Sequence, residues 1–400
     1  MDTAGYDLEL AHVGAFRGPP EVLIGDGAVD DIPQMIAGWG LGDGPVLLVC
    51  DRVVAQLGLS ARVLDALAAE PNRAETFDQI DGEPDSATAA AVVQAARAND
   101  YVAVIGLGGG SAMDLAKLAA GLATNPGEVL DAVGVDRLAD PALPLLLIPT
   151  TAGTGAEATR ISMISHGGEK RIINDVQLIA RGVVLDATLV TSLPKPVTAA
   201  TGLDALSHAI EGALSANATA LSTRSSFDAV ELLARSLPRA YVDGGDLAAR
   251  RGCLVGSYLA GLALNAGSIL GHSMGYTIAN RVKVPHGISV AMSLPYCIAY
   301  AATAATDRID TLFARAGEPA ADHAHIYGWI DALLHDLEVP TALSDLGLTR
   351  ADANDMAREC VERYPRPNNP TPLELDRLTD LYGFMWNGNL DAAVSAFTDG

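Results

Sequence analysis

The sequence predicts an α/β domain followed by an all-helical domain, and two observations carry this prediction. Short apolar runs alternate with helical patterns up to about residue 190, whereas Ala-, Leu- and Ser-rich segments with helical spacing follow from Val197 onwards. Strands separated by helices favour a parallel sheet with helices on both faces. We therefore place the domains at residues 1–190 and 191–400, and we expect them to pack closely and hold a site between them.

The expected elements follow from apolar runs and helical spacing along the chain. The expected strands of the first domain lie at 45–51, 101–107, 143–148 and 183–186, and its helices at 53–69, 86–98 and 112–124. Ser86 stands where it can cap the second of these helices. The expected helices of the second domain lie at about 198–215, 219–240, 246–266, 287–304, 322–337 and 371–386.

Composition excludes several classes of protein. The 400 residues include 49 acidic and 26 basic side chains, giving a net charge of −23, so a nucleic-acid or membrane-surface partner is not expected. The four cysteines form no CxxC pair, which argues against a zinc ribbon, a redox motif or a disulfide framework. The N-terminus lacks the pattern of a signal peptide, and the uncharged stretch 252–280 contains Asn, His and many Gly, which indicates a buried helix and its exit. We expect a cytoplasmic protein.

A glycine-rich turn follows the apolar run 101–107. Gly108–Ser111 precede a helical pattern, and glycines let the backbone approach a ligand closely. The helix N-terminus behind them offers free N–H donors and a partial positive charge to a diphosphate. A plain strand–helix turn is the alternative, because Gly106-x-Gly108-x-x-Ser111 departs from GxGxxG at its last position.

Two further segments favour a dinucleotide at the same edge. Residues 149–157 follow the third apolar run with three hydroxyls and two glycines, and loops at the carboxyl ends of parallel strands bind ligands. Asp51 ends the first run, where its carboxylate can accept bonds from a ribose diol; the alternative role for Asp51 is a helix N-cap.

One Asp and three His suggest a metal site. Asp204 and His208 are four residues apart, about 6 Å on one helix face. His272 and His286 follow in otherwise uncharged, Gly-containing segments. Each His alone is better explained as a core or capping residue, but the four together suit a divalent ion such as Fe²⁺ or Zn²⁺.

These segments together resemble the iron-containing (group III) alcohol dehydrogenase family. The resemblance runs in order over nearly the whole chain, through residues 46–51, 108–117, 149–159, 186–212, 271–287 and 366–373. It implies an N-terminal Rossmann-like dinucleotide-binding domain and a C-terminal helical metal-binding domain, a dehydroquinate synthase-like architecture, with the metal in the cleft between them.

The resemblance also implies roles for individual residues. The implied metal ligands are Asp204, His208, His272 and His286. The implied cofactor-binding residues are Asp51, Gly109, Gly110, Ser111, Asp114, Thr150, Thr151, Thr154, Thr159 and Lys170. Among these, Asp51 matches the position where an acid favours NAD over NADP, Asp114 lies near the nicotinamide, and Lys170 reaches the ribose.

Tyr276 departs from the family pattern. Many members carry a second His four residues after the third ligand, where it relays a proton, and this chain has Tyr276 there. The tyrosine also occurs in members that resemble hydroxyacid–oxoacid transhydrogenases. We hypothesise that Tyr276 and Asp114 are catalytic, with Tyr276 orienting the substrate carbonyl; the alternative is that Tyr276 only packs.

The implied function is metal-dependent hydride transfer that interconverts an alcohol and an aldehyde or ketone. The expected cofactors are NAD, with NADP as the alternative, and Fe²⁺, with Zn²⁺ as the alternative. We expect a small-molecule substrate and a homo-oligomer, a dimer, without nucleic acid or membrane. One rival function is a hydroxyacid–oxoacid transhydrogenase that retains its cofactor. Another is a metal-dependent lyase of the dehydroquinate-synthase type, which would need a more basic pocket. A third is a non-catalytic descendant, which would be expected to lose metal ligands.

Overall fold

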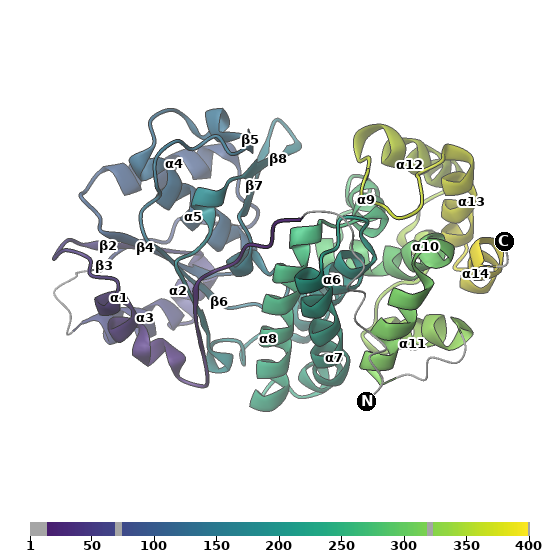
Figure 1. Ribbon diagram of the computed structural model, residues 1–400, viewed down its shortest axis with the longest axis horizontal. Coiled ribbons are helices and arrows are strands. Elements are labelled where there is room, and N and C mark those ends of the chain that lie inside the picture. The colour runs from purple at the N-terminus through teal and green to yellow at the C-terminus, as the bar shows by residue number, and fades with distance from the viewer. Residues whose placement is uncertain (1–13, 69–73, 318–322, 399–400) are drawn as a thin grey trace. The chain divides into compact units, whose positions relative to one another are not determined.

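The computed structural model describes residues 14–68, 74–317 and 323–398 (Figure 1). The chain divides into two compact units. Arg17–Ser192 form an α/β unit, and the second unit begins at Leu193, includes the described residues 14–16, and is helical. The predicted fold class, an α/β half followed by a helical half, is confirmed.

A six-stranded parallel sheet forms the centre of the α/β unit. Its order is β1(Glu21–Ile24), β9(Gly182–Leu185), β6(Leu145–Pro149), β4(Ala103–Gly108), β2(Val46–Cys50) and β3(Ala74–Phe77). The four expected strands are the inner ones, β2, β4, β6 and β9. The sequence prediction missed β1 and β3 because edge strands are partly exposed and carry no continuous apolar run.

The strand order reverses direction between β2 and β4. From β2 the chain first moves outward to β3, then returns to β4 on the other side and continues to β6 and β9. Ligands of open α/β sheets bind at the carboxyl ends of the strands next to such a switch point. Asp51 follows β2 and the glycine-rich turn follows β4, so both lie at this point.

Among the helices of the α/β unit, the first was not expected, and two further details differ from the prediction. The helices are α1(Ile32–Gly38), α2(Arg52–Gln56), α3(Leu59–Leu67), α4(Ser86–Arg97) and α5(Gly110–Thr124), with short 3-10 helices at Ala28–Asp31, Val129–Ala132, Ala156–Ala158, Val176–Leu178 and Ala187–Leu189. The single helix expected at 53–69 is broken at Gly58, whose φ of 76° is left-handed. Asp85, and not Ser86, caps α4, by accepting a hydrogen bond from the Thr88 N–H at 2.7 Å.

A small second sheet was not predicted. Its strands are β5(Gly134–Val135), β8(Glu169–Asn174) and β7(Ile161–His166), with β7 and β8 antiparallel. Gly167 and Gly168 connect them, both with positive φ, as a tight hairpin requires. The hairpin is polar and half-exposed, which explains why no apolar run revealed it.

The helical unit contains three helices beyond those expected. The expected helices are α6(Lys195–Leu214), α7(Ala220–Val242), α8(Leu247–Ala263), α10(His286–Ala316), α11(His323–Asp336) and α13(Leu375–Trp386), and the additional ones are α9(Leu270–Ala279), α12(Arg350–Arg363) and α14(Leu390–Thr398). Short 3-10 helices lie at Leu264–Ala266 and Leu343–Leu346. The uncharged stretch 252–280 is therefore two helices, bent by 106° around Gly267, whose φ is 75°.

Small residues allow the helices of this unit to approach closely. A Cβ at Gly202 of α6 would overlap the Leu237 side chain of α7, and most of α6 is buried. Among the described residues, α10 by itself has the length and apolarity of a membrane span, but 83% of that apolar window is buried inside the structure. Burial of this kind is typical of the core helix of a folded domain.

Candidate functional site

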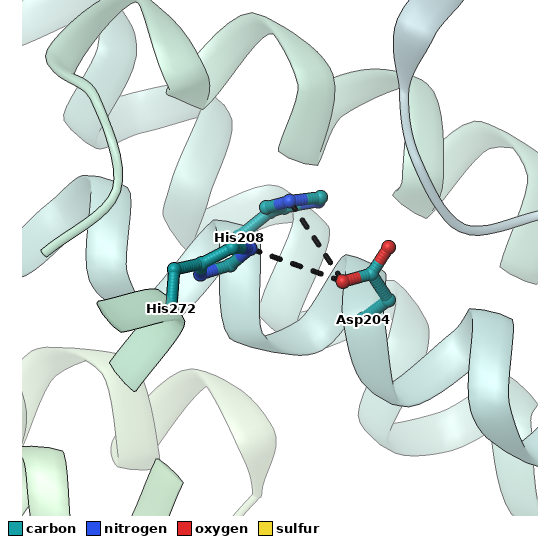
Figure 2. Close-up of side chains that lie close together, drawn as sticks. All are labelled: Asp204, His208 and His272. Atoms are coloured by element: carbon teal, nitrogen blue, oxygen red, sulfur yellow. Dashed lines mark ion pairs between the residues drawn. The ribbon is translucent and has the colours of Figure 1, made fainter. Parts of the chain in front are cut away.

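Three imidazoles surround one carboxylate oxygen in the helical unit. Asp204 and His208 lie one turn apart on α6, His272 lies in the first turn of α9, and His286 begins α10. Figure 2 shows the Asp204, His208 and His272 side chains pointing toward one another. The Nε2 atoms of His208, His272 and His286 lie 3.9, 3.9 and 3.8 Å from Asp204 Oδ1. The four predicted metal ligands are thus together.

These atoms fit a divalent cation. Asp204 Oδ1 and His272 Nε2 are buried and have no hydrogen-bond partner. The separations of 3.8–3.9 Å are too long for hydrogen bonds but shorter than twice the ligand distance of about 2.0–2.2 Å. Ligand atoms of Asp204, His208 and His272 all lie within 4.8 Å of one another, so a single ion can contact these three, while His286 Nε2 lies near the same oxygen but outside this group. Buried polar atoms without partners are costly, and a bound ion would satisfy them.

A glycine allows the third histidine to reach this position. His286 is the first residue of α10, after Pro285, and Gly287 follows it. A Cβ at Gly287 would overlap the Ala200 carbonyl oxygen of α6, so only glycine lets the start of α10 contact α6. The His286 side chain is 43% exposed, whereas the other three ligands are buried.

Glu211, which the sequence prediction did not select, contacts the second ring nitrogen of His272. Its Oε1 lies 2.6 Å from His272 Nδ1, and both side chains are buried. Burial raises the pKa of the Glu211 carboxyl, but the His272 imidazole and Arg366 lower it more, so the net pKa lies below its usual value. The signal was available, because Asp204, His208 and Glu211 share one helix face at spacings of four and seven.

Tyr276 lies beside the histidines, as expected if the helix continued past His272. Its ring stacks on His286, with centroids 5.5 Å apart and 12° between planes, and meets His272 edge-on at 6.4 Å. Burial raises the pKa of Tyr276, and the charge and hydrogen bond of Arg366 oppose that rise. Arg366 also donates from Nε to Ser273 Oγ at 2.9 Å. The sequence prediction did not select Arg366.

In the α/β unit, the glycine-rich turn forms the start of α5. Gly109 is the N-cap and supplies no side-chain cap, so the first N–H groups of α5 lack a local side-chain acceptor. A Cβ at Gly110 would come within 2.8 Å of Thr154 Cγ2, and one at Gly109 within 3.5 Å of Thr151 Oγ1. The turn after β4 and the threonine loop after β6 are therefore in direct contact, with Ser111 following in the helix. Thr150 is buried and donates its N–H to the Gly108 carbonyl.

Asp51 both caps a helix and faces the glycine-rich turn. Its Oδ1 accepts from the Val54 N–H at 2.8 Å, which is the alternative role given by the sequence. Its Oδ2 lies 2.9 Å from the position that a Cβ at Gly108 would take. The φ of Gly108 is 151°, so this position favours glycine on both counts.

A cluster of buried charges lies behind this edge. Lys117, fully buried, donates to the Ile161 carbonyl and to Thr159 Oγ1, and lies 3.7 Å from Asp114 Oδ1. Asp114 Oδ2 accepts from the Met163 N–H of the hairpin. Burial raises the pKa of Asp114 to about 6, against the pull of Lys117.

Two further charged residues, Glu157 and Lys170, lie in the α/β unit. Glu157 is 1% exposed, its Oε1 has no hydrogen-bond partner, and burial raises its pKa to about 7. Lys170, on β8, pairs with Glu83. Of the predicted cofactor residues, Asp51, Gly109, Gly110, Thr151 and Thr154 gather at the turn, whereas Asp114 and Thr159 belong to the buried cluster and Lys170 to an exposed ion pair.

Known proteins resemble the chain over nearly its full length. The model of the iron-containing alcohol dehydrogenase family matches residues 19–187, and that of the C-terminal domain of this family matches residues 198–386. Long-chain-alcohol dehydrogenase 1 of Geobacillus thermodenitrificans is 35% identical over 383 residues, which cover 93% of this chain and 96% of the relative.

Solved structures give the same result. A 1,3-propanediol oxidoreductase is 25% identical, with a TM-score of 0.88, and the match covers 93% of this chain and 99% of the other. A sulfoacetaldehyde reductase from Bifidobacterium kashiwanohense, solved in complex with NAD⁺, is 26% identical, with a TM-score of 0.84 and coverage of 94% and 99%.

Proposed function

The chain belongs to the iron-containing alcohol dehydrogenase family, and we propose that Asp204, His208, His272 and His286 hold its iron. Family membership confirms the predicted reaction class, an oxidoreductase that interconverts an alcohol with an aldehyde or ketone, and the predicted cofactors, NAD and iron. The observation that carries the ligand proposal is the convergence of three Nε2 atoms on the buried Asp204 Oδ1, which has no hydrogen-bond partner.

The metal and the nicotinamide cofactor supply the reactive chemistry, and the protein must bind and orient them. A divalent ion supplies Lewis-acid polarisation of an alcohol or carbonyl oxygen, and nicotinamide accepts or donates the hydride. Asp204 contributes the one negative charge among the four proposed ligands, so a divalent ion held by them would keep a net positive charge and would favour an alkoxide over an alcohol. His208 and His272 are buried and would shield such an ion from water.

We propose that the dinucleotide lies at the switch point of the α/β unit. Gly109, Gly110 and Ser111 offer backbone N–H groups to the diphosphate, and Thr150, Thr151 and Thr154 line the facing loop. Asp51 Oδ2 accepts from the ribose and disfavours the 2′-phosphate of NADP. Thr159 lines the cofactor with the other threonines, Lys170 reaches the ribose, and Asp114 lies near the nicotinamide, where the buried cluster holds it in place.

Tyr276 is proposed as a catalytic residue. The stack on His286 places its ring beside the metal ligands, and Arg366 hydrogen-bonds its hydroxyl. The hydroxyl can then donate to a substrate oxygen, although a phenol cannot take up a proton near neutrality as an imidazole can.

We propose that the enzyme is cytoplasmic and acts as a homo-oligomer, a dimer. The outer edge of β1 has no partner strand among the described residues, and Ile24 there is exposed, which supports a protein partner at this edge. Light scattering after size-exclusion chromatography distinguishes a dimer of about twice the chain mass from a monomer.

One experiment tests the function as a whole. The protein is purified without oxygen, its iron and zinc contents are measured, and NADH consumption is followed with small aldehydes, ketones and ketoacids. We expect about one divalent ion per chain and consumption of free NADH with a single carbonyl substrate. Metal-free protein with full activity contradicts the ligand proposal. Turnover that requires both a hydroxyacid and an oxoacid, with no use of free NADH, identifies the transhydrogenase instead.

A further inference from the structure

The helix that carries His272 has no cap of its own. The N-cap of α9 is Ile269, which supplies no side-chain hydrogen bond. Distant side chains satisfy its first N–H groups. Glu211 Oε2 accepts from Ile269 N at 2.7 Å and from His272 N at 3.3 Å, and Asn369 Oδ1 accepts from Leu270 N at 3.1 Å. The start of α9 is therefore positioned by residues 58 to 99 positions away in the sequence.

Glu211 uses its second oxygen on the His272 ring. Oε1 lies 2.6 Å from Nδ1, in a region where both side chains are buried. An ionised carboxylate only accepts hydrogen bonds, so the proton of this contact lies on Nδ1. Nε2 then carries the lone pair, and Nε2 is the atom that lies 3.9 Å from Asp204 Oδ1 without a hydrogen-bond partner.

Gly271 makes this close approach possible. A Cβ at Gly271 would lie 2.7 Å from Glu211 Oε1 and 3.0 Å from its Cδ. The Gly271 φ is not positive, so the backbone itself does not require glycine here. Space for the carboxylate is what requires it.

We propose that Glu211 is a positioning residue for the metal, which fixes the tautomer and the orientation of His272 so that Nε2 is available as a ligand. This inference rests on the proposed assignment of His272 as a ligand. Outer partners of metal-bound histidines act in this way, by accepting the hydrogen bond of the ring nitrogen that faces away from the ion.

The same geometry predicts what an amide would do at this position. In Glu211→Gln, the two N–H groups at the Oε2 position require an acceptor, so the amide oxygen stays there. The amide NH₂ then faces Nδ1 and donates to it, which moves the ring proton to Nε2. The variant keeps the size of the side chain and its bonds to α9, but it removes the lone pair that a metal needs.

The test is the affinity of the metal-stripped chain for Co²⁺, measured by titration against a chelator and by the visible absorption of the bound ion. We expect Glu211→Gln to weaken Co²⁺ binding by about 10- to 100-fold and to alter the absorption spectrum. Circular dichroism of the metal-free variant reports whether it folds. Affinity within twofold of the parent, with an unchanged spectrum, overturns the inference.

Asn369→Ala is the matched control. It removes a hydrogen bond to the same end of α9, from Leu270 N, and leaves the bond between Glu211 and the His272 ring in place. We expect a lower melting temperature and a Co²⁺ affinity within threefold of the parent. An affinity loss as large as that of Glu211→Gln would mean that anchoring of α9, and not the ring contact, sets metal affinity, and this also overturns the inference.

Two further variants keep the result decisive. If Glu211→Gln does not fold, Gly271→Ala displaces Glu211 Oε1 without removing its charge, and parent-like Co²⁺ affinity in that variant overturns the inference. His272→Ala tests the underlying assignment separately. Parent-like affinity in His272→Ala contradicts the proposed ligand set, whereas loss of binding there together with parent-like affinity in Glu211→Gln contradicts the role of Glu211 alone.

Discussion

Each unit buries a carboxylate oxygen that has no hydrogen-bond partner, but the surroundings of the two oxygens differ. In the helical unit, three imidazole nitrogens lie within 3.9 Å of Asp204 Oδ1. In the α/β unit, Glu157 Oε1 is buried without a hydrogen-bond partner, and the charge of Lys117 lowers the pKa of this carboxyl by less than burial raises it. Several lone pairs directed at one point can bind a cation. A buried carboxylate without such ligands favours its protonated form.

The surroundings of a buried acid determine whether it keeps its charge. Removing a carboxylate from water favours its neutral form unless a charge or several donors compensate. The histidine nitrogens near Asp204 are placed to bind an ion together with it, and that ion would compensate the charge of the Asp204 carboxylate. The charge of Lys117 only partly compensates for the burial of Glu157, so the pKa of Glu157 is raised to about 7.

The largest expected effect is at the metal site. His286→Ala removes one of the four proposed ligands from a half-exposed position, so the fold should stay intact. We expect iron affinity to fall by more than the roughly 100-fold that loss of an outer partner costs, and activity to fall with it. Metal analysis and circular dichroism check this.

The control for this prediction is His335→Ala, an exposed histidine at the end of α11. It should retain both metal and activity. Loss of activity in His286→Ala with full iron content would show that His286 acts on the substrate and is not a ligand.

The second prediction concerns Glu157 and pH. Its pKa in the folded chain, about 7, lies above the value of 4.5 expected when it is exposed, so the folded state binds this proton more tightly. The free energy of unfolding therefore falls, through this group, as pH rises from about 4.5 to about 7, by on the order of 3 kcal/mol. Glu157→Gln stays neutral and should lose this dependence, so the variant gains stability relative to the parent above pH 7.

Urea unfolding of the metal-free chain at pH 5, 6, 7 and 8 measures this difference. Glu362→Gln, on the exposed side of α12, is the control and should stay within about 0.5 kcal/mol of the parent at every pH. A constant difference between Glu157→Gln and the parent would show that Glu157 does not change its protonation on unfolding in this range.

Local sequence patterns predicted the inner strands of the α/β unit and the residues that follow them, for a physical reason. The inner strands are buried on both faces, so they are continuous apolar runs, and the glycines and Asp51 follow directly after them. A local pattern was therefore enough. The edge strands and the polar hairpin of β7 and β8 are half-exposed and carry no such pattern.

The metal site depends on contacts that no local pattern contains. Asp204 and His208 share a helix face, which spacing predicts, and His272 and His286 were selected by their otherwise uncharged, Gly-containing segments. Glu211 and Asn369 hold α9 from 58 and 99 residues away, and Arg366 reaches Tyr276 from a loop. Such partners are determined only by how the helices pack.

The third prediction concerns cofactor choice at the α/β edge. Asp51→Ser keeps a helix cap but removes the charge beside the glycine-rich turn. We expect the ratio of kcat/KM for NADH over NADPH to fall by about tenfold, equivalent to about 1.4 kcal/mol, because a 2′-phosphate no longer meets a like charge.

Asp85→Ser is the control for Asp51→Ser, because Asp85 caps α4 through the same kind of bond, at 2.7 Å. It should change stability without changing the cofactor ratio. A parent that uses NADPH at least as well as NADH would contradict the assignment of Asp51 before any variant is made.

The last prediction concerns Tyr276, where a catalytic role and a packing role give different results. Tyr276→Phe keeps the ring that stacks on His286 and removes only the hydroxyl beside Arg366. If the hydroxyl orients the substrate oxygen, kcat/KM should fall by about tenfold, or about 1.4 kcal/mol of barrier, with unchanged metal content. Tyr364→Phe is the matched control, because its ring also contacts Tyr276, at 5.3 Å, but its hydroxyl faces Asn280. A change below about threefold in Tyr276→Phe, equal to that of Tyr364→Phe, would mean that Tyr276 serves only to pack against the histidines.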